Sequence, residues 1–215
     1  MQAVNHVTAI QGLEGRGQST PRQTGTRERA LSTAAEILRR DGYSRLTMER
    51  VAAESGVAKT TLYRRWPTRA ALCMELYLEV AGRELKDPDT GDVQSDLTHI
   101  VNTVVYLQTR TVAGPAFIGL IAEAQSNPEA SSASLVKFAE RRREITRRVL
   151  ERAIQRGELR AGTDIDVVID ALGGATTFRL LQGHAPLSRK FADALVTLVL
   201  SGCRDPHSRC ARKEM

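Results

Sequence analysis

The sequence has no apolar run long enough to span a membrane, and its first twenty residues lack the basic-then-hydrophobic order of a signal peptide. We therefore expect a cytoplasmic location and no membrane partner. Only three cysteines occur, Cys73, Cys203 and Cys210. Three is an odd number, and two of the three lie in a polar C-terminal segment, which is typical of reduced thiols rather than of a disulfide framework.

Catalytic signatures are also absent. The four histidines are scattered, and the sequence contains no GxSxG, Walker loop, HExxH or dinucleotide fingerprint. Cys203, His207 and Cys210 offer only three possible metal ligands within the polar C-terminal segment, so we expect no metal site and no cofactor. These absences argue against an enzyme and leave binding proteins as the class to consider.

No segment shows the period-two alternation of a β-strand, and apolar residues recur at helical spacing along most of the chain. The sequence therefore predicts an all-α fold with about nine helices. The segments expected to be helical are 24–40, two helices within 46–65, 67–85, 92–110, 114–125, 128–156, 164–182 and 188–201.

Composition divides the chain into four parts. Residues 1–22 are rich in Gly, Gln, Ser and Thr without periodicity, so we expect a disordered arm. Residues 23–84 are expected to form a small helical domain that ends at the segment LKDPDTGD, and residues 85–202 a larger one; a length of 215 residues also suits one mid-sized helical unit. Residues 203–215 are expected to form a disordered tail.

The most informative segment is 46–66, LTMERVAAESGVAKTTLYRRW. Thr47 precedes an apolar periodic run and is expected to cap a helix of about two turns. Gly56 is expected to end that helix, because glycine adopts the left-handed conformation at little cost. Val57 and Leu62 then point back to the core and leave one side of a second short helix exposed. A helix, a glycine turn and a second helix are typical of a helix-turn-helix motif.

The exposed side of the second helix is basic. All charged residues from Lys59 to Arg69 are cations, and residues 44–72 contain six basic and two acidic residues. The formal net charge of the whole chain is +6, so much of the excess lies at this motif. Two threonines and a tyrosine add hydroxyls that suit phosphates and base edges. The alternative is a helical hairpin with a solvated face, but such a face usually mixes acids with bases.

This part of the chain resembles the TetR family of one-component transcriptional regulators. The resemblance covers residues 26–43, TRERALSTAAEILRRDGY, and 46–72, LTMERVAAESGVAKTTLYRRWPTRAAL. Ala58 replaces the usual serine and Thr60 the usual glycine, and the second departure bears on the operator sequence. The positions that match the family pattern are Gly42, Tyr43, Thr47, Val51, Ala52, Gly56, Val57, Lys59, Thr61, Leu62, Tyr63, Trp66, Thr68 and Arg69.

The resemblance implies a three-helix DNA-binding domain at 23–84, with its motif at 46–65, and a ligand-binding and dimerisation bundle at 85–202. It also implies a homodimer that binds a palindromic operator in double-stranded DNA and is released by a small-molecule effector. Repression is the usual outcome, and activation stays open. The residues expected to contact DNA are Thr47, Lys59, Thr60, Thr61, Tyr63, Arg64, Arg65, Trp66 and Arg69, with Lys59, Thr60 and Arg64 as candidates for base edges. Trp66 has a second interpretation, as a core residue.

The effector site is expected within the bundle of the fourth to eighth predicted helices, between residues 67 and 182. Few charges fall among the candidate residues, so a mostly apolar ligand is favoured. Each candidate has the alternative of being an ordinary core residue. The candidate pocket residues are Tyr77, His99, Thr103, Tyr106, Phe117, Ile121, Phe138 and Phe178.

The last two predicted helices are expected to form the dimer interface, since small residues along one side permit the close approach of a partner helix. Residues 156–181 also resemble, more weakly, the regulatory-domain ends of some TetR-family members. The candidate interface residues are Ala171, Gly174, Ala175, Phe178, Leu195, Leu198 and Val199.

A second run of arginines lies between residues 141 and 148. Glu140, Glu144 and Glu151 occur near these arginines at three- and four-residue spacings, so we expect a solvated helix face rather than a second DNA-binding patch. Three alternatives to a specific regulator stay open: an enzyme, a sequence-neutral nucleoid protein, and a helical interaction module that keeps the motif only as a scaffold.

Overall fold

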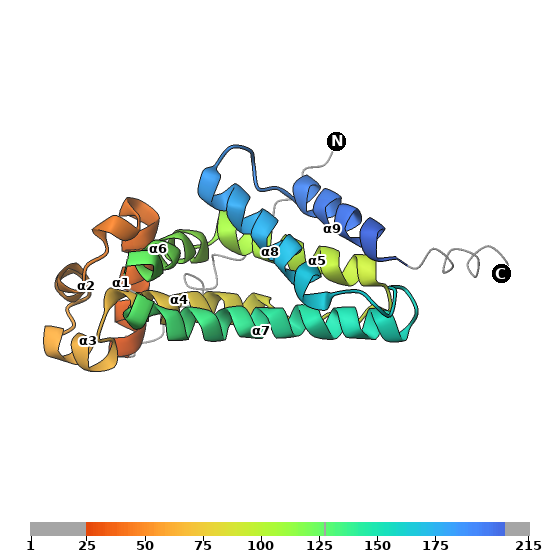
Figure 1. Ribbon diagram of the computed structural model, residues 1–215. Helices are drawn as coiled ribbons and strands as arrows, with labels where there is room; N and C mark the ends of the chain where they lie inside the picture. Colours follow the sequence, from red (N-terminus) through yellow and green to blue (C-terminus); the bar gives the residue numbers. More distant parts are fainter. Residues whose placement is uncertain (1–24, 127, 205–215) are drawn as a thin grey trace, which may run out of the picture.

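The computed structural model describes the backbone of residues 25–126 and 128–204, and the side chains of these residues except 126–139 and 141 (Figure 1). The described part contains nine α-helices and one short 3-10 helix, which confirms the predicted all-α fold. The predicted arm at 1–22 lies outside the described residues. The helices are α1 (Thr26–Asp41), η2 (Tyr43–Arg45), α2 (Met48–Ser55), α3 (Lys59–Arg65), α4 (Arg69–Glu84), α5 (Val93–Arg110), α6 (Ala113–Ser126), α7 (Pro128–Gln155), α8 (Ile165–Gln182) and α9 (Arg189–Cys203).

Side-chain caps set the first residue of several helices. Asp92, Asp164 and Ser188 each accept a hydrogen bond from a backbone N–H in the first turn of α5, α8 and α9. At α4 the cap is Thr68, whose hydroxyl accepts a hydrogen bond from the N–H of Ala71 at 3.1 Å. The expected start of this helix at Pro67 is therefore wrong by two residues, because the chain is still extended at Thr68.

A first hydrophobic cluster joins α1, α2, α3 and α4 to α6 and to the C-terminal end of α5. Ala34 of α1, Val51 of α2, Leu62 of α3 and Leu72 of α4 are fully buried in it. Phe117 of α6 belongs to the same cluster, so the N-terminal helices pack on α6 as well as on α4. In Figure 1, α1 to α3 form the left end of the molecule, with α6 and α4 beside them.

A second hydrophobic cluster holds α5, α7, α8 and α9 together. Leu97 of α5, Leu150 of α7 and Leu200 of α9 are fully buried in this cluster. The end of α9 is tied to the α7–α8 connection, because the N–H of Arg160 donates to the carbonyl of Cys203 at 3.0 Å. Cys203 is the last residue of α9 and not the first residue of the predicted tail 203–215. The part of that tail from residue 205 onward lies outside the described residues.

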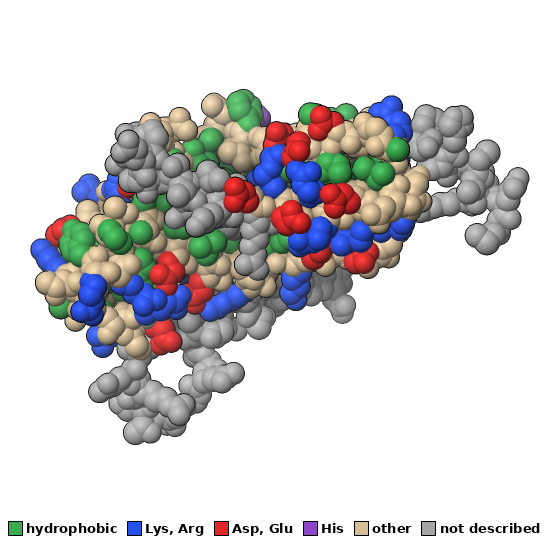
Figure 2. Space-filling model, turned by 60° about the horizontal axis from the view of Figure 1, so that its bottom comes forward, with side chains coloured by type: hydrophobic (Ala, Val, Ile, Leu, Met, Phe, Trp, Pro, Cys, Tyr) green, Lys and Arg blue, Asp and Glu red, His purple; other side chains and the backbone are tan. Residues whose placement is uncertain are grey.

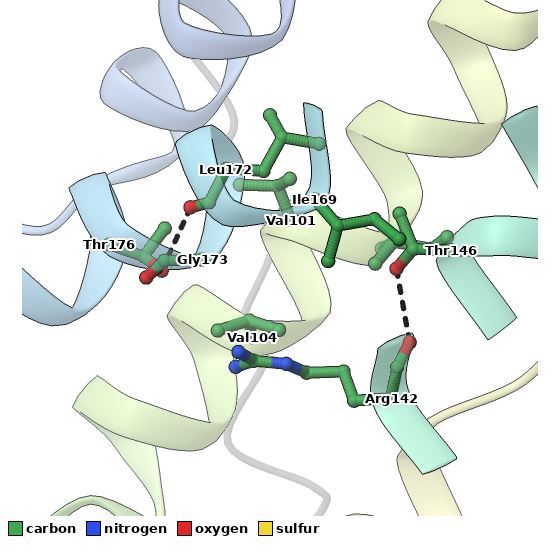
Figure 3. Close-up of a pocket in the computed structure, with 9 residues that line it drawn as sticks. Val101, Val104, Arg142, Thr146, Ile169, Leu172, Gly173 and Thr176 are labelled. Atoms are coloured by element: carbon green, nitrogen blue, oxygen red, sulfur yellow. Dashed lines mark hydrogen bonds between the residues drawn. The ribbon is translucent and has the colours of Figure 1, made fainter. Parts of the chain in front are cut away.

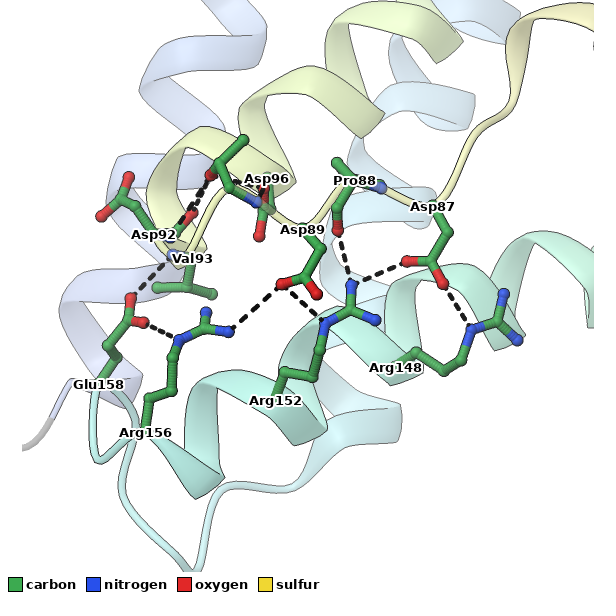
Figure 4. A network of polar contacts seen from close by, with 11 residues as sticks. Asp87, Pro88, Asp89, Asp92, Val93, Asp96, Arg148, Arg152, Arg156 and Glu158 are labelled. Atoms are coloured by element: carbon green, nitrogen blue, oxygen red, sulfur yellow. Dashed lines mark hydrogen bonds and ion pairs between the residues drawn. The ribbon is translucent and has the colours of Figure 1, made fainter.

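The arginines of α7 pair mainly with acids from other segments. Arg148 and Arg152 each lie 2.8 Å from a carboxylate oxygen of Asp87 in the α4–α5 connection, and Asp89 lies 3.4 Å from Arg152 (Figure 4). Among the described side chains, only the Arg148–Glu144 pair at 3.2 Å has the four-residue spacing within α7. The face shown in Figure 2 accordingly has basic and acidic side chains side by side. Long-range pairs, which helical spacing does not reveal, thus neutralise Arg143, Arg147, Arg148 and Arg152 of this helix.

Among the described residues, no single helix is both long and apolar enough to cross a membrane. The pair α5 and α6, which is bent by 87°, meets the requirement only when its two helices are taken together, and on length and composition alone. Both helices contribute side chains to the buried clusters.

Candidate DNA interface and effector cavity

The α2–α3 segment is built from local signals. The Thr47 hydroxyl accepts a hydrogen bond from the N–H of Arg50 at 3.2 Å and caps α2. Gly56 has φ 69° and ψ 15°, and its N–H donates to the carbonyl of Ala52 at 3.0 Å, which ends the helix. Ala58 occupies the N-cap position of α3 without a side-chain cap. Helix, glycine turn and second helix thus lie where the sequence predicts them.

The outward side of α3 is defined by the two residues that point inward, Leu62 and Trp66, which are 0% and 2% exposed. At 3.6 residues per turn, Thr60 and Arg64 fall opposite this buried stripe. Both are exposed, and so are the flanking candidates Lys59, Tyr63 and Arg65, while Thr61 is half-buried. The predicted DNA-contacting side chains of α3 therefore extend from both flanks of the buried stripe around to its far side, and Trp66, which follows the helix, lies within the stripe.

An acid of α2 orients Tyr63. The Tyr63 hydroxyl donates to a carboxylate oxygen of Glu49 at 2.8 Å. This hydrogen bond raises the pKa of Tyr63 and lowers the pKa of Glu49, because it favours the neutral phenol and the charged carboxylate. Tyr63 keeps 42% of its surface exposed, and its hydroxyl oxygen still has lone pairs that can accept a hydrogen bond.

Trp66 belongs to the core in this structure. Its indole N–H donates to Glu75 of α4 at 2.7 Å, and the Arg65 guanidinium lies 5.2 Å from the centre of its ring. Glu75 also accepts a hydrogen bond from Arg27 of α1 at 2.5 Å. Burial works against ionisation of Glu75, but the hydrogen bonds from Trp66 and Arg27 hold its pKa below the ordinary value. The indole N–H thus already has a partner, and a phosphate contact from Trp66 stays a prediction.

Arg69, another candidate phosphate contact, is engaged with α6. Its Nε lies 2.9 Å from Oε2 of Glu123, and the Tyr43 hydroxyl donates to the same oxygen. The Arg69 guanidinium also lies 4.8 Å from the centre of the Tyr43 ring. Burial and the hydrogen bond to Glu123 both raise the pKa of Tyr43. We call these three residues the α6 junction, since they connect η2 and α4 to α6.

The α6 junction also depends on a glycine. A Cβ added at Gly119 would lie 2.0 Å from the Tyr43 ring, so only glycine allows the ring to lie against α6. Neither Gly119 nor Glu123 was among the predicted residues. They lie about 80 positions from Tyr43 in the sequence, and no local pattern connects them.

Three of the predicted pocket residues do lie together. The rings of Tyr77 and Phe117 stack with centroids 5.8 Å apart, and Ile121 packs on the same cluster. Burial raises the pKa of Tyr77 to about 12. These residues connect α4 with α6, directly beneath the N-terminal helices.

The other predicted pocket residues are dispersed. His99 is exposed, and the Thr103 hydroxyl donates to its backbone carbonyl at 2.9 Å. Tyr106 lines a groove of about 290 Å³ between α1, α4 and α5. Phe178 is 59% exposed on α8, and Phe138 lies outside the residues whose side chains are described.

A cavity that the sequence reasoning missed lies among α5, α7 and α8, and it has a volume of about 30 Å³. Figure 3 shows Arg142 extending from α7 toward Val104 of α5. Helical spacing could have predicted that Arg142 points inward, because this residue lies three and seven positions before the buried Ile145 and Val149. From the sequence, the arginines of this run are instead expected to lie on a solvated face. The described residues that line this cavity are Ile100, Val101, Val104, Arg142, Thr146, Ile169, Leu172, Gly173 and Thr176.

Several predicted interface residues form an exposed stripe on α8. Ala171, Gly174 and Phe178 are exposed, and Val167 and Leu181, which were not predicted, extend the stripe by one turn at each end. On α9, Leu198 is 70% exposed, whereas Leu195 is buried in the second cluster of the same chain. Ala175 and Val199 are half-buried. In the described part of the chain, no three His, Cys, Asp or Glu side chains are placed to hold a metal ion.

Two family descriptions match the chain. "Tetracyclin repressor-like, C-terminal domain" covers residues 87–199, and "Bacterial regulatory proteins, tetR family" covers residues 30–76. The uncharacterized HTH-type transcriptional regulator YdeS of Bacillus subtilis strain 168 is 35% identical over 183 residues, which are 85% of this chain and 91% of YdeS. The DNA-binding transcriptional repressor TetR of Mycobacteroides abscessus is 33% identical over 184 residues, 81% of this chain and 94% of the relative.

A solved structure is similar over almost its whole length. The crystal structure of the TetR family transcription regulator SCO0332 is 37% identical in sequence and superposes with a TM-score of 0.68. The match covers 82% of this chain and 97% of that structure. The similarity therefore extends from the helix-turn-helix segment through the larger bundle.

Proposed function

This chain belongs to the TetR family of transcriptional regulators, which bind DNA, and we propose that it is a repressor of this kind. In this proposal a homodimer binds a palindromic operator, and a small, mostly apolar ligand releases it. The exposed basic side of α3 carries the proposal. The name of the Mycobacteroides abscessus relative, a transcriptional repressor, favours repression over activation.

We assign the base contacts to the middle of the exposed side of α3. Thr60 and Arg64 lie opposite the buried stripe, so these side chains enter the major groove most deeply. Lys59 is the first residue of α3, and the N-terminal residues of a recognition helix contact base edges. Arginine or lysine with guanine is the commonest specific contact, and a threonine methyl can contact thymine. The remaining candidates, the exposed Thr47, Tyr63 and Arg65 and the half-buried Thr61, are assigned to phosphates.

Trp66 and Arg69 have a different place in this proposal. Both are held by carboxylates, Trp66 by Glu75 and Arg69 by Glu123. We assign Trp66 to positioning α3 against α4. Arg69 reaches a phosphate only when its pair with Glu123 opens, which makes that contact sensitive to the position of α6.

The exposed stripe of α8 supplies the proposed dimer interface. Val167 and Phe178 are 61% and 59% exposed, and Ala171 and Gly174 between them allow a second helix to approach closely. On the neighbouring helix, Leu198 adds a further exposed apolar side chain. A two-fold dimer through this surface would present two copies of α3 to DNA, roughly 34 Å apart or somewhat more.

Release by a ligand requires that the ligand bind one conformation of the dimer better than another. The larger bundle supplies an apolar interior among α5, α7 and α8. The α6 junction supplies contacts between that bundle and the DNA-binding helices. We propose that the ligand acts by changing the position of α4 and α6 and, with them, the distance between the two copies of α3.

The test is a mobility shift of the purified protein on the DNA that flanks its own gene, with excess random duplex at physiological salt. We expect a discrete complex that survives competition. Arg64→Ala should abolish or strongly weaken it, whereas Arg83→Ala, which removes an arginine that is 68% exposed on α4, should not. If random duplex competes away the complex, and does so also for every DNA sequence selected for binding to the protein, specific regulation is contradicted. That result would favour a sequence-neutral DNA-binding protein.

A further inference from the structure

Arg142 is the one arginine of α7, among those whose side chains are described, that has no acidic partner. Arg143 and Arg147 each lie 2.6 Å from a carboxylate oxygen of Asp166, and Arg148 and Arg152 pair with the α4–α5 connection. The Arg142 guanidinium has neither an ion pair nor a hydrogen-bond acceptor among the described residues. Among the described side chains, the outward arginines of this helix thus have acidic partners and the inward one has none.

The surroundings of Arg142 are apolar or already hydrogen-bonded. Val104, Ile169 and Leu172 contribute aliphatic side chains to the cavity. The hydroxyl of Thr176 donates to the carbonyl of Leu172 at 3.1 Å, and the hydroxyl of Thr146 donates to the carbonyl of Arg142 itself at 3.1 Å (Figure 3). The cavity therefore presents N–H donors from Arg142 and no charged acceptor for them.

A glycine allows this placement. A Cβ added at Gly173 of α8 would lie 3.1 Å from a terminal guanidinium nitrogen of Arg142, so the cation lies against the α8 backbone. Burial lowers the pKa of Arg142 below its usual value; the nearby Tyr77 opposes this shift, and the neighbouring Arg143 charge adds to it. An unpaired cation in such a site is costly, since apolar surroundings disfavour charge.

A larger groove holds no comparably shielded cation, because its Arg39 and Arg110, which have no ion pair among the described residues, are exposed. The groove of about 290 Å³ between α1, α4 and α5 has acids and bases on its rim. Its Glu79 already pairs with Arg27 at 3.2 Å and with Arg83 at 2.7 Å. An anion at Arg142 therefore meets a more shielded cation than in this groove and breaks no ion pair of the described residues.

We propose that the cavity among α5, α7 and α8 binds the carboxylate of an apolar organic acid, with Arg142 as the pairing cation. This inference rests on the proposed function and names the chemical class of the effector. A planar guanidinium matches a carboxylate with two parallel hydrogen bonds, and the aliphatic side chains contact the apolar part of the ligand. Arg142 would then determine specificity for acids over neutral analogues.

The size of the cavity bears on how such a ligand acts. About 30 Å³ is enough for a carboxylate head group, whereas sites for drug-sized ligands have roughly 300–1,000 Å³. Binding of the whole acid must therefore separate α8 from α5 and α7. The acid consequently favours a conformation with a wider bundle, which is the differential affinity that release from DNA requires.

The test uses the full chain and three acids, decanoate, phenylacetate and naphthoate, each beside its primary amide. Calorimetric titration should show at least one acid binding wild type about 10-fold to 100-fold more tightly than its amide. Arg142→Gln should remove this preference. Arg143→Gln, at the adjacent outward position, should keep it. Equal binding of every acid and its amide by wild type, or an unchanged preference in Arg142→Gln, would overturn the proposal.

The stability of the ligand-free protein gives a second readout. Arg142→Met should unfold at the same temperature as wild type or higher, because it replaces a half-buried cation that has no partner among the described residues with an apolar side chain. A clearly lower unfolding temperature would mean that Arg142 has a structural partner, and it would overturn the proposal. Release from operator DNA is measured separately. If only neutral compounds release the protein from operator DNA, the acid-binding site is wrong and the proposed repressor function stands. If an acid binds but no specific DNA complex forms, the repressor function is wrong and the acid-binding site stands.

Discussion

Arg69, the first residue of α4, and Glu123, the only charged residue of α6, form an ion pair with Nε and Oε2 2.9 Å apart. Tyr43 donates its hydroxyl to the same carboxylate oxygen. Both contacts join the helices that carry the DNA-binding motif to a helix that also contacts the ligand-binding bundle. Motion of α6 therefore reaches the motif through two side chains as well as through the apolar cluster.

Removing the charge of Glu123 should weaken this connection. The Glu123 side chain is only 17% exposed, so Glu123→Gln leaves Arg69 with a neutral partner in a partly buried site. We expect the free energy of unfolding in urea to fall by about 1–3 kcal/mol. The control is Glu144→Gln, because the ion pair of Glu144 with Arg148 is more exposed. This variant should lower the free energy of unfolding by about 0.5 kcal/mol or less. Equal losses for the two variants would contradict a structural role for the α6 junction.

Gly119→Ala should destabilise the protein because the new methyl group collides with the Tyr43 ring. We expect a loss of about 1–3 kcal/mol in the free energy of unfolding. Gly82→Ala is the matched control, since Gly82 lies in α4 with open space around it and alanine should stabilise the helix by about 0.5–1 kcal/mol. In a Tyr43→Ala background, Gly119→Ala should become neutral or stabilising. An additive double-mutant cycle would show that the two residues do not interact.

Asp87 should contribute stability at neutral pH and lose it in acid. Hydrogen bonds from Arg152 and Arg148 hold its pKa below the ordinary value, so its ionised form favours the folded state above the unfolded-state pKa. This contribution disappears as the pH falls through the lowered pKa of the folded protein. We expect Asp87→Asn to cost about 1 kcal/mol of unfolding free energy at about pH 7 and much less below about pH 3. A loss of the same size at both pH values would contradict the ion-pair explanation.

Cys73 should resist alkylation in the native protein. Burial raises the pKa of its thiol to about 12, so very little of the reactive thiolate forms near neutral pH. Iodoacetamide should modify Cys73 only when urea unfolds the chain, as followed by mass spectrometry of peptides. Cys203 is half-buried and its pKa is also raised by burial, so it should react slowly rather than not at all. Native labelling of Cys73 at the rate seen in urea would show that the first cluster opens readily.

The features that the sequence predicts correctly have local causes. The cap at Thr47, the left-handed Gly56 and the inward Leu62 lie within sixteen positions of one another, so periodicity and glycine placement are enough to locate α2 and α3. The two ends of α5 and α8 follow from the same kind of signal. Tertiary contacts do not follow from such local signals. The contact between Glu123 and Tyr43 could not be predicted, because the residues between them do not indicate that α6 packs against η2.

The effector cavity shows a different limit. Pocket residues chosen for their aromatic or polar type scatter over the structure, since exposure separates His99 and Phe178 from the buried Tyr77. Arg142 and Arg143 are neighbours in one basic run, yet one lies inward and the other pairs with Asp166. Helical phase could have distinguished these two arginines, but only the three-dimensional structure shows that Arg142 has no acidic partner among the described side chains.

Hydroxyl-radical footprinting of the protein on its flanking DNA tests the central claim most directly, namely that a dimer presents α3 to two operator half-sites. We expect two protected segments of matching sequence in opposite orientation, centred roughly 34 Å apart along the duplex or somewhat more. Lys59→Ala and Arg64→Ala should remove both segments together. Protection of a single segment, uniform protection of any duplex, or footprints unchanged in both variants would contradict the claim.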